Sequence, residues 1–200
     1  RSLTNAVRYN NTLKTLNLET ILSGGTVNDT TRLATIGWWN LFMGLLQSPN
    51  STLERLNLKG FGQGFDDSMI ESLGNALAYN SRLRELSLHF IRHITPVGWQ
   101  NFVDVLRNPN LALEKLYLNY NSINDHFIVI FVEALASNNT LKVFNFGDED
   151  IDGGSHSGNI NQISPVGFAP FAQILCDTSG IMNTYNSNHT LEKLCGKFRQ

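Results

Sequence analysis

One short pattern of apolar residues recurs along the chain, and we call it the phrase. It consists of an apolar residue, two intervening residues, a second apolar residue, one intervening residue and a third apolar residue. The first leucines of the six phrases are separated by 40, 30, 30, 28 and 50 residues, and the sixth phrase lacks its third apolar residue. These leucines are Leu13, Leu53, Leu83, Leu113, Leu141 and Leu191. Because successive side chains in a strand point to opposite faces, each phrase predicts a short strand with one apolar face.

A second pattern lies between the phrases and predicts helices. Apolar residues at i, i+3, i+4 and i+7 form one face of a helix. This spacing begins at Trp39, Trp99, Ile128 and Phe168 and is nearly complete from Ile70. Each repeating unit is therefore predicted to contain one strand followed by one helix.

Start and stop signals flank the predicted helices. An N-cap oxygen followed by proline suits the first helical turn, and the candidate N-caps are Thr35, Asp66, Thr95 (before Pro96) and Ser164 (before Pro165). Turns with Asn and Pro at 47–50 and 107–110 indicate helix ends.

Neither element of a unit can bury its apolar face alone, so the units are expected to stack. Parallel strands lie about 4.8 Å apart, whereas packed helices need roughly 8–10 Å. Neighbouring units must fan out, which predicts an α/β solenoid with parallel strands on the concave face and helices on the convex face.

The strand phrase, the period of 28–30 residues and the helix in each unit resemble the ribonuclease-inhibitor type of leucine-rich repeat. The resemblance covers nearly the whole chain and is strongest over 53–140. It implies a right-handed horseshoe, here a single array over 1–200 with five to six units, incomplete at both ends. The consensus Asn occurs only at Asn121, and its equivalents are Ile21, Phe61, Ile91 and Glu149, so no continuous asparagine ladder is expected.

Composition narrows the classes of partner. Fifteen Lys and Arg against seventeen Asp and Glu give a formal net charge of -2, and no basic block indicates a nucleic-acid partner. No apolar run approaches the roughly 20 residues of a membrane-spanning helix, so no membrane insertion is expected. Cys176 and Cys195 are too few for a disulfide framework, and two unpaired thiols favour a cytoplasmic or nuclear location.

An acidic segment opens like an EF-hand loop, with Asp148, Asp150 and Asp152 followed by Gly153. An EF-hand needs a preceding helix and a glutamate at the twelfth position, whereas here a predicted strand precedes the segment and Asn159 occupies that position. We interpret the segment as a solvated insertion, with a weak cation site at the three aspartates as the alternative. No cofactor is expected.

Other motifs favour structural roles. Glycines at 60–64 suit a turn, and the pair His89 and His93 lies where a strand passes into a loop, which does not favour zinc. Four glycosylation sequons, at Asn10, Asn50, Asn138 and Asn188, share one repeat position, which favours turn chemistry over glycosylation. Trp38 is interpreted as packing into the enlarged first-unit loop, with an exposed contact residue as the alternative.

The intervening residues of the strand phrases are predicted to point outward. Three columns result, and the richest patch spans three adjacent units: Arg55, Lys59, Glu85, His89, Lys115, Tyr117 and Asn119. This patch is either a partner-binding site or an ordinary solvated sheet face.

The resemblance implies a non-catalytic scaffold that binds a protein partner through its concave face and loops. The alternative is a fragment of a Ran-type GTPase-activating regulator of a small GTPase. Nucleophile, base and orienting group do not coincide anywhere in the sequence, so the chain is not expected to be an enzyme.

Overall fold

The computed structural model describes residues 12–18, 29–59, 65–91, 93–147, 161–176, 178–182 and 187–196, and within α2 the side chains from Gly37 on except that of Trp38. Six strands form one sheet whose order follows the chain. The strands are β1 (Thr15–Asn17), β2 (Arg55–Asn57), β3 (Glu85–Ser87), β4 (Lys115–Tyr117), β5 (Val143–Asn145) and β6 (Lys193–Cys195). Every neighbouring pair is parallel, so the strand prediction is confirmed for all six phrases.

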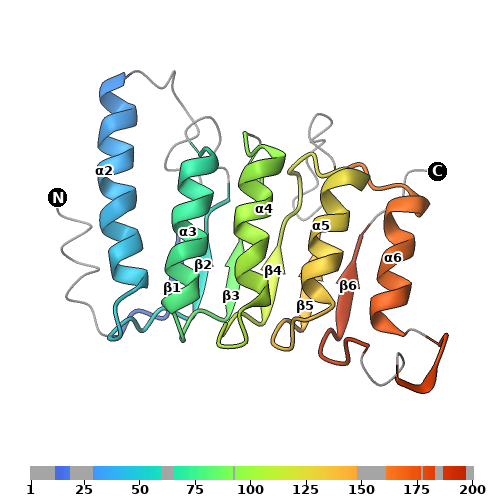
Figure 1. The fold of residues 1–200 in the computed structure, drawn as a ribbon. Helices are drawn as coiled ribbons and strands as arrows, with labels where there is room; N and C mark the ends of the chain where they lie inside the picture. The colour runs from blue at the N-terminus through green and yellow to red at the C-terminus, as the bar shows by residue number, and fades with distance from the viewer. Residues whose placement is uncertain are drawn as a thin grey trace.

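The helices line up in the same order and cover one face of the sheet (Figure 1). They are α2 (Asp29–Leu46), α3 (Asp67–Tyr79), α4 (Pro96–Asp104, continued by a 3₁₀ turn at Val105–Arg107), α5 (Asp125–Leu135) and α6 (Pro165–Leu175). We call the opposite face of the sheet, toward which the intervening residues of the phrases point, the strand face. None of the helices within the described ranges is long and apolar enough to cross a membrane.

Three of the four predicted helix starts are confirmed. Asp66, Thr95 and Ser164 each accept a hydrogen bond from a backbone N–H in the first turn of the helix that follows. Thr35 is not an N-cap, because α2 has 18 residues and already begins at Asp29. Asn124 caps α5, which the sequence analysis did not predict.

The core lies between the sheet and the helices. Leu56, Leu86 and Leu116 are no more than 1% exposed, and so are Trp39 and Trp99 at the start of their helical patterns. The predicted face of α6 is less well covered: Phe171 is buried, Phe168 is half-buried and Ala172 is exposed. This difference follows from position, because no described helix packs against the far side of α6.

Two asparagines, in the turns that follow β4 and β5, each join their turn to the turn of the preceding unit, which corrects the expectation that only Asn121 serves this role. Asn121 donates to the carbonyl of Leu88 (2.6 Å) and accepts from the N–H of Ile91 (2.6 Å). Asn161 does the same one unit later: it donates to Leu118 (2.8 Å) and accepts from the N–H of Asn121 (3.1 Å). If the residues inserted after Gly147 are left out of the count, Asn161 occupies the consensus Asn position of its unit.

A second set of asparagines joins each helix end to the next unit. Asn80, Asn138 and Asn188 each donate to a carbonyl at the end of the helical segment of the preceding unit, those of Leu46, Leu106 and Leu135, and each accepts two backbone N–H groups of its own turn. Asn138 and Asn188 of the sequons are therefore turn residues, as predicted, and both are buried. Asn50 differs: it is exposed, and its N–H donates to Ser48 (3.3 Å).

Successive helices are also tied together at their N-termini. Asp67 of α3 accepts hydrogen bonds from the N–H and hydroxyl of Thr95, and Asp125 of α5 accepts the same pair from Ser164. A Cβ at Gly98 would come within 2.3 Å of Asp67, and one at Gly167 within 2.2 Å of Asp125. The close approach of carboxylate to helix therefore requires glycine at both positions.

Candidate partner-binding face

The strand pairing brings predicted site residues from distant parts of the sequence into one line. Arg55 pairs with Glu85, and Glu85 pairs with Lys115. We call the whole line the strand row: Thr15, Arg55, Glu85, Lys115, Val143 and Lys193. The Glu85 carboxylate lies between two cations, 3.7 Å from Arg55 Nε and 3.6 Å from Lys115 Nζ.

A second line, two residues further along each strand, carries mainly uncharged polar groups. It consists of Asn17, Asn57, Ser87, Tyr117, Asn145 and Cys195. Burial is the main cause, and the negative charge of Glu85 a further one, of a raised pKa for the Tyr117 phenol. The hydroxyl is therefore protonated at neutral pH and can donate a hydrogen bond to a partner.

The third predicted column, which contains Lys59, His89 and Asn119, contributes less surface than the alternation of side chains along a strand suggested. His89 is 7% exposed and Asn119 is fully buried, while Lys59 remains half-exposed. The Asn119 amide donates to the carbonyl of Gly147 and to Asn145 Oδ1. Asn119 thus joins the ends of β4 and β5 rather than facing a partner.

A charged line just before the strands was missed by the sequence analysis. We call it the edge row: Lys14, Glu54, Arg84, Glu114, Lys142 and Glu192. The sign of the charge alternates at every step. The alternation of sign at the repeat period is the sequence signal that could have revealed it.

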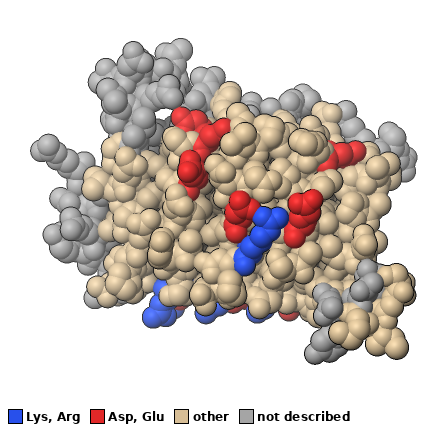
Figure 2. Space-filling view, in the orientation of Figure 1, with Lys and Arg blue, Asp and Glu red and all other residues tan. Residues whose placement is uncertain are grey.

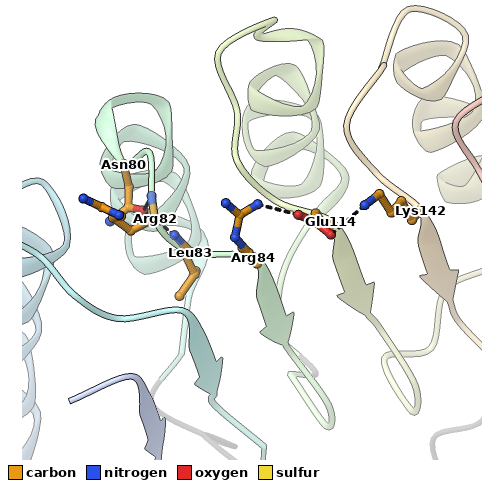
Figure 3. Close-up of polar contacts among 6 residues, drawn as sticks. All are labelled: Asn80, Arg82, Leu83, Arg84, Glu114 and Lys142. Atoms are coloured by element: carbon orange, nitrogen blue, oxygen red, sulfur yellow. Dashed lines mark hydrogen bonds and ion pairs between the residues drawn. The ribbon is translucent and has the colours of Figure 1, made fainter. Parts of the chain in front are cut away.

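Neighbours in the edge row form ion pairs. Lys14 Nζ lies 2.9 Å from Glu54 Oε1, and Lys142 Nζ lies 3.0 Å from Glu114 Oε2. Arg84 contacts the other oxygen of Glu114, so this carboxylate is held from both sides (Figure 3). The hydrogen bond from Lys142 is the main cause of a lowered pKa for Glu114, and the one from Lys14 has this effect on Glu54.

The described residues hold no group of three His, Cys, Asp or Glu side chains placed to bind a metal ion. Asp148, Asp150 and Asp152 lie outside the described residues, and so do the glycines at 60–64. Both cysteine thiols are unpaired.

Comparison with known proteins relates the chain to others by fold. No protein-family profile and no curated protein sequence matches it. Among solved structures, "Leiomodin-1 Actin-Binding Site 2 (ABS2)" matches with a TM-score of 0.56 and 19% sequence identity, over 79% of this chain and 78% of that chain. At this identity the match shows a common fold. Together with the six repeated phrases and their parallel strands, it makes the fold leucine-rich-repeat-like.

Proposed function

We propose that this chain is a non-catalytic protein-binding scaffold whose binding site is the strand face. The supporting observation is the strand register, which places outward side chains of six units in continuous rows. Stacked repeats hold such rows in place without a partner, which lowers the entropic cost of binding. Arg55 and Tyr117 are of the residue types that dominate protein interfaces.

The similarity to the leiomodin-1 domain agrees with this proposal, because that domain is described as an actin-binding site and actin is a protein. The comparisons give no support to the alternative of a Ran-type GTPase-activating fragment.

The proposal includes the finer architecture. We infer a right-handed horseshoe of the ribonuclease-inhibitor type, formed by residues 1–200 as one array, with the strand face concave. The supporting argument is the difference between the spacing of strands, about 4.8 Å, and that of helices, roughly 8–10 Å, which bends the stack away from the helices. A crystal structure with a flat or left-handed stack would contradict this part.

The strand-face site is tested with matched tyrosine variants. A partner captured from an extract of the source cells is purified, and its Kd is measured for wild type, Tyr117→Ala and Tyr79→Ala. Tyr79 is a suitable control because it is 78% exposed at the end of α3. We expect Tyr117→Ala to weaken binding by about ten-fold and Tyr79→Ala to leave it unchanged. Equal affinities for all three proteins would rule out the strand face.

A further inference from the structure

In the ion pairs on the strand face, the cation is more exposed than the carboxylate. In the five pairs of the two charged rows, the cation side chains are 45% to 67% exposed and the carboxylates 26% to 37%. The pairs are Lys14–Glu54, Arg55–Glu85, Lys115–Glu85, Arg84–Glu114 and Lys142–Glu114. In each pair the cation is the more exposed member, so a partner that approaches this side meets positive charge first.

The carboxylates are also too few to neutralise the cations. Glu85 is shared by Arg55 and Lys115, and Glu114 by Arg84 and Lys142. In these pairs five cations face three carboxylates, and over the two rows as a whole six cations face four. The contacts of Glu85, at 3.7 and 3.6 Å, exceed the usual hydrogen-bond length of about 2.7–3.2 Å. Arg55 and Lys115 are therefore held only by charge and can turn toward a new acceptor.

The helix face has the opposite character. Over α3, α4 and α5 with their caps and the 3₁₀ turn, six acidic residues accompany a single Lys or Arg residue, Arg107. Figure 2 shows acidic groups predominating on this face. The acids are Asp66, Asp67, Glu71, Asp104, Asp125 and Glu133. A chain of net charge -2 therefore separates its charges between two faces, and such a separation orients charged partners as they approach.

We propose that the strand face binds an acidic, extended segment of its protein partner, with Arg55 and Lys115 as the principal contacts. The proposal rests on the proposed function and adds the chemistry of the partner. Arg55 and Lys115 are two strands apart, which is about 10 Å. In an extended chain, residues three apart are separated by about 10 Å. A segment that crosses β2 to β4 with an acidic residue at every third position therefore matches the two cations.

The probe is a fluorescein-labelled peptide of six Glu-Gly-Ser triplets, compared with six Lys-Gly-Ser triplets, with binding followed by anisotropy at about 20 mM and about 300 mM salt. The double variant Arg55→Gln/Lys115→Gln removes the proposed contacts. Arg82→Gln/Arg107→Gln removes the same net charge elsewhere and is the control. Thermal unfolding of each variant establishes that it is folded.

We expect the glutamate peptide to bind the wild type in preference to the lysine peptide and more weakly at the higher salt. The strand-face variant should lose about ten-fold in affinity, since one exposed ion pair is worth about two- to five-fold, and the control less than about two-fold. Chemical-shift changes in amide NMR spectra should fall on the strand row.

Equal losses in the two double variants, preference for the lysine peptide, or shifts on the helix face would each overturn the inference. Tighter binding of an oligonucleotide of equal charge would also overturn it, in favour of nucleic acid. The captured partner separates the two proposals. If it binds Tyr117→Ala more weakly, but its affinity changes neither with salt nor in Arg55→Gln/Lys115→Gln, the charge chemistry is refuted and the proposed function stands.

Discussion

Asparagine side chains offer a donor and an acceptor on one rigid amide, and this protein uses them on both sides of its strands. Asn121 and Asn161 lie in the turns after the strands, while Asn80, Asn138 and Asn188 lie in the turns before them. Each amide satisfies backbone groups of a neighbouring unit, and all of them except that of Asn121 also satisfy backbone groups of their own unit. Buried backbone groups without hydrogen-bond partners lower the stability of the folded state. These asparagines therefore hold neighbouring units together.

Replacing Asn161 by alanine should destabilise the protein strongly. Its amide donates to the carbonyls of Leu118 and Phe146 and accepts from the N–H groups of Asn121 and Ile123. Four buried backbone groups would lose their partner, which we expect to lower the free energy of unfolding by at least about 3 kcal/mol.

Urea denaturation measures this loss. The matched control is Asn110→Ala, because Asn110 is exposed in the turn before β4, and its change should stay below about 0.5 kcal/mol. Similar stabilities for the two variants would contradict the role assigned to Asn161.

At the residue scale, outward-facing positions of the strands could be predicted from alternation, because a strand fixes the direction of its own side chains. The burial of His89 and Asn119 could not, since these residues follow the strands, where exposure depends on the neighbouring turn. The role of Asn161 could not be predicted from the sequence, because the insertion places it 15 residues after Phe146, whereas Asn121 follows Leu118 closely.

Among the elements, α3 and α4, and likewise α5 and α6, are joined by one repeated contact, in which an aspartate of the first helix accepts hydrogen bonds from the N-cap residue of the second. Asp67 accepts from the N–H of Thr95 (2.8 Å) and from its hydroxyl, and Thr95 in turn caps α4 through Gly98. The spacing between α3 and α4 thus depends on the missing side chain of Gly98.

Alanine at Gly98 should therefore destabilise, although alanine usually favours a helix. Its Cβ would displace the Asp67 carboxylate from Thr95, and we expect a loss of about 1–3 kcal/mol. Gly44→Ala in α2 is the control, because nothing lies within 4 Å of a Cβ built there, and it should stabilise by about 0.5–1 kcal/mol. Thermal unfolding measures the change in stability of both variants. If both changes had the same sign, the steric argument would be refuted.

The ion pairs of the edge row make stability depend on pH. The pKa of Glu114 is lowered in the folded state, so the unfolded chain binds its proton first as the pH falls. The contribution of Glu114 is present above its ordinary pKa of about 4.5 and is lost as the pH falls through the lowered value.

Glu114→Gln should then cost up to about 1 kcal/mol at pH 7 and progressively less toward pH 3. Urea midpoints measured across this range test the trend. Glu71→Gln serves as the control, because Glu71 is exposed on α3 and forms no ion pair with a described residue. A difference between wild type and Glu114→Gln that does not change with pH would contradict the assignment.

Strands and most helices could be predicted because each repeats a pattern several times. The start of α2 could not: Thr35 occupies the place that begins shorter helices, but α2 extends to Asp29 and has 18 residues, whereas α4 has 9 before its 3₁₀ turn. The order of the units in the sheet followed from stacking alone, since a strand and helix without a covered face must pack on the next unit.

In the whole molecule, burial increases from the ends of the described sheet to its middle. Leu86 of β3 is fully buried, whereas the equivalent Leu16 of β1 is half-buried. In a repeat array each unit is stabilised mainly by its neighbours, so the middle units should contribute most.

Leu86→Ala should lower the free energy of unfolding by about 2–5 kcal/mol, and Leu16→Ala by roughly half of that or less, because Leu16 is not fully buried. Chemical denaturation of the two variants in the full chain compares them at equivalent positions of the repeat. Equal costs would show that the sheet is as tightly packed at β1 as at its centre.

The alternating charges of the edge row restrict how such a protein can change in length. Removing the unit of Arg84 would set Glu54 beside Glu114, and duplicating one unit would set two identical charges side by side, which repels. Gain or loss of two adjacent units keeps opposite signs together. Changes of repeat number by an even step should therefore cost less stability at the edge row than changes by an odd step.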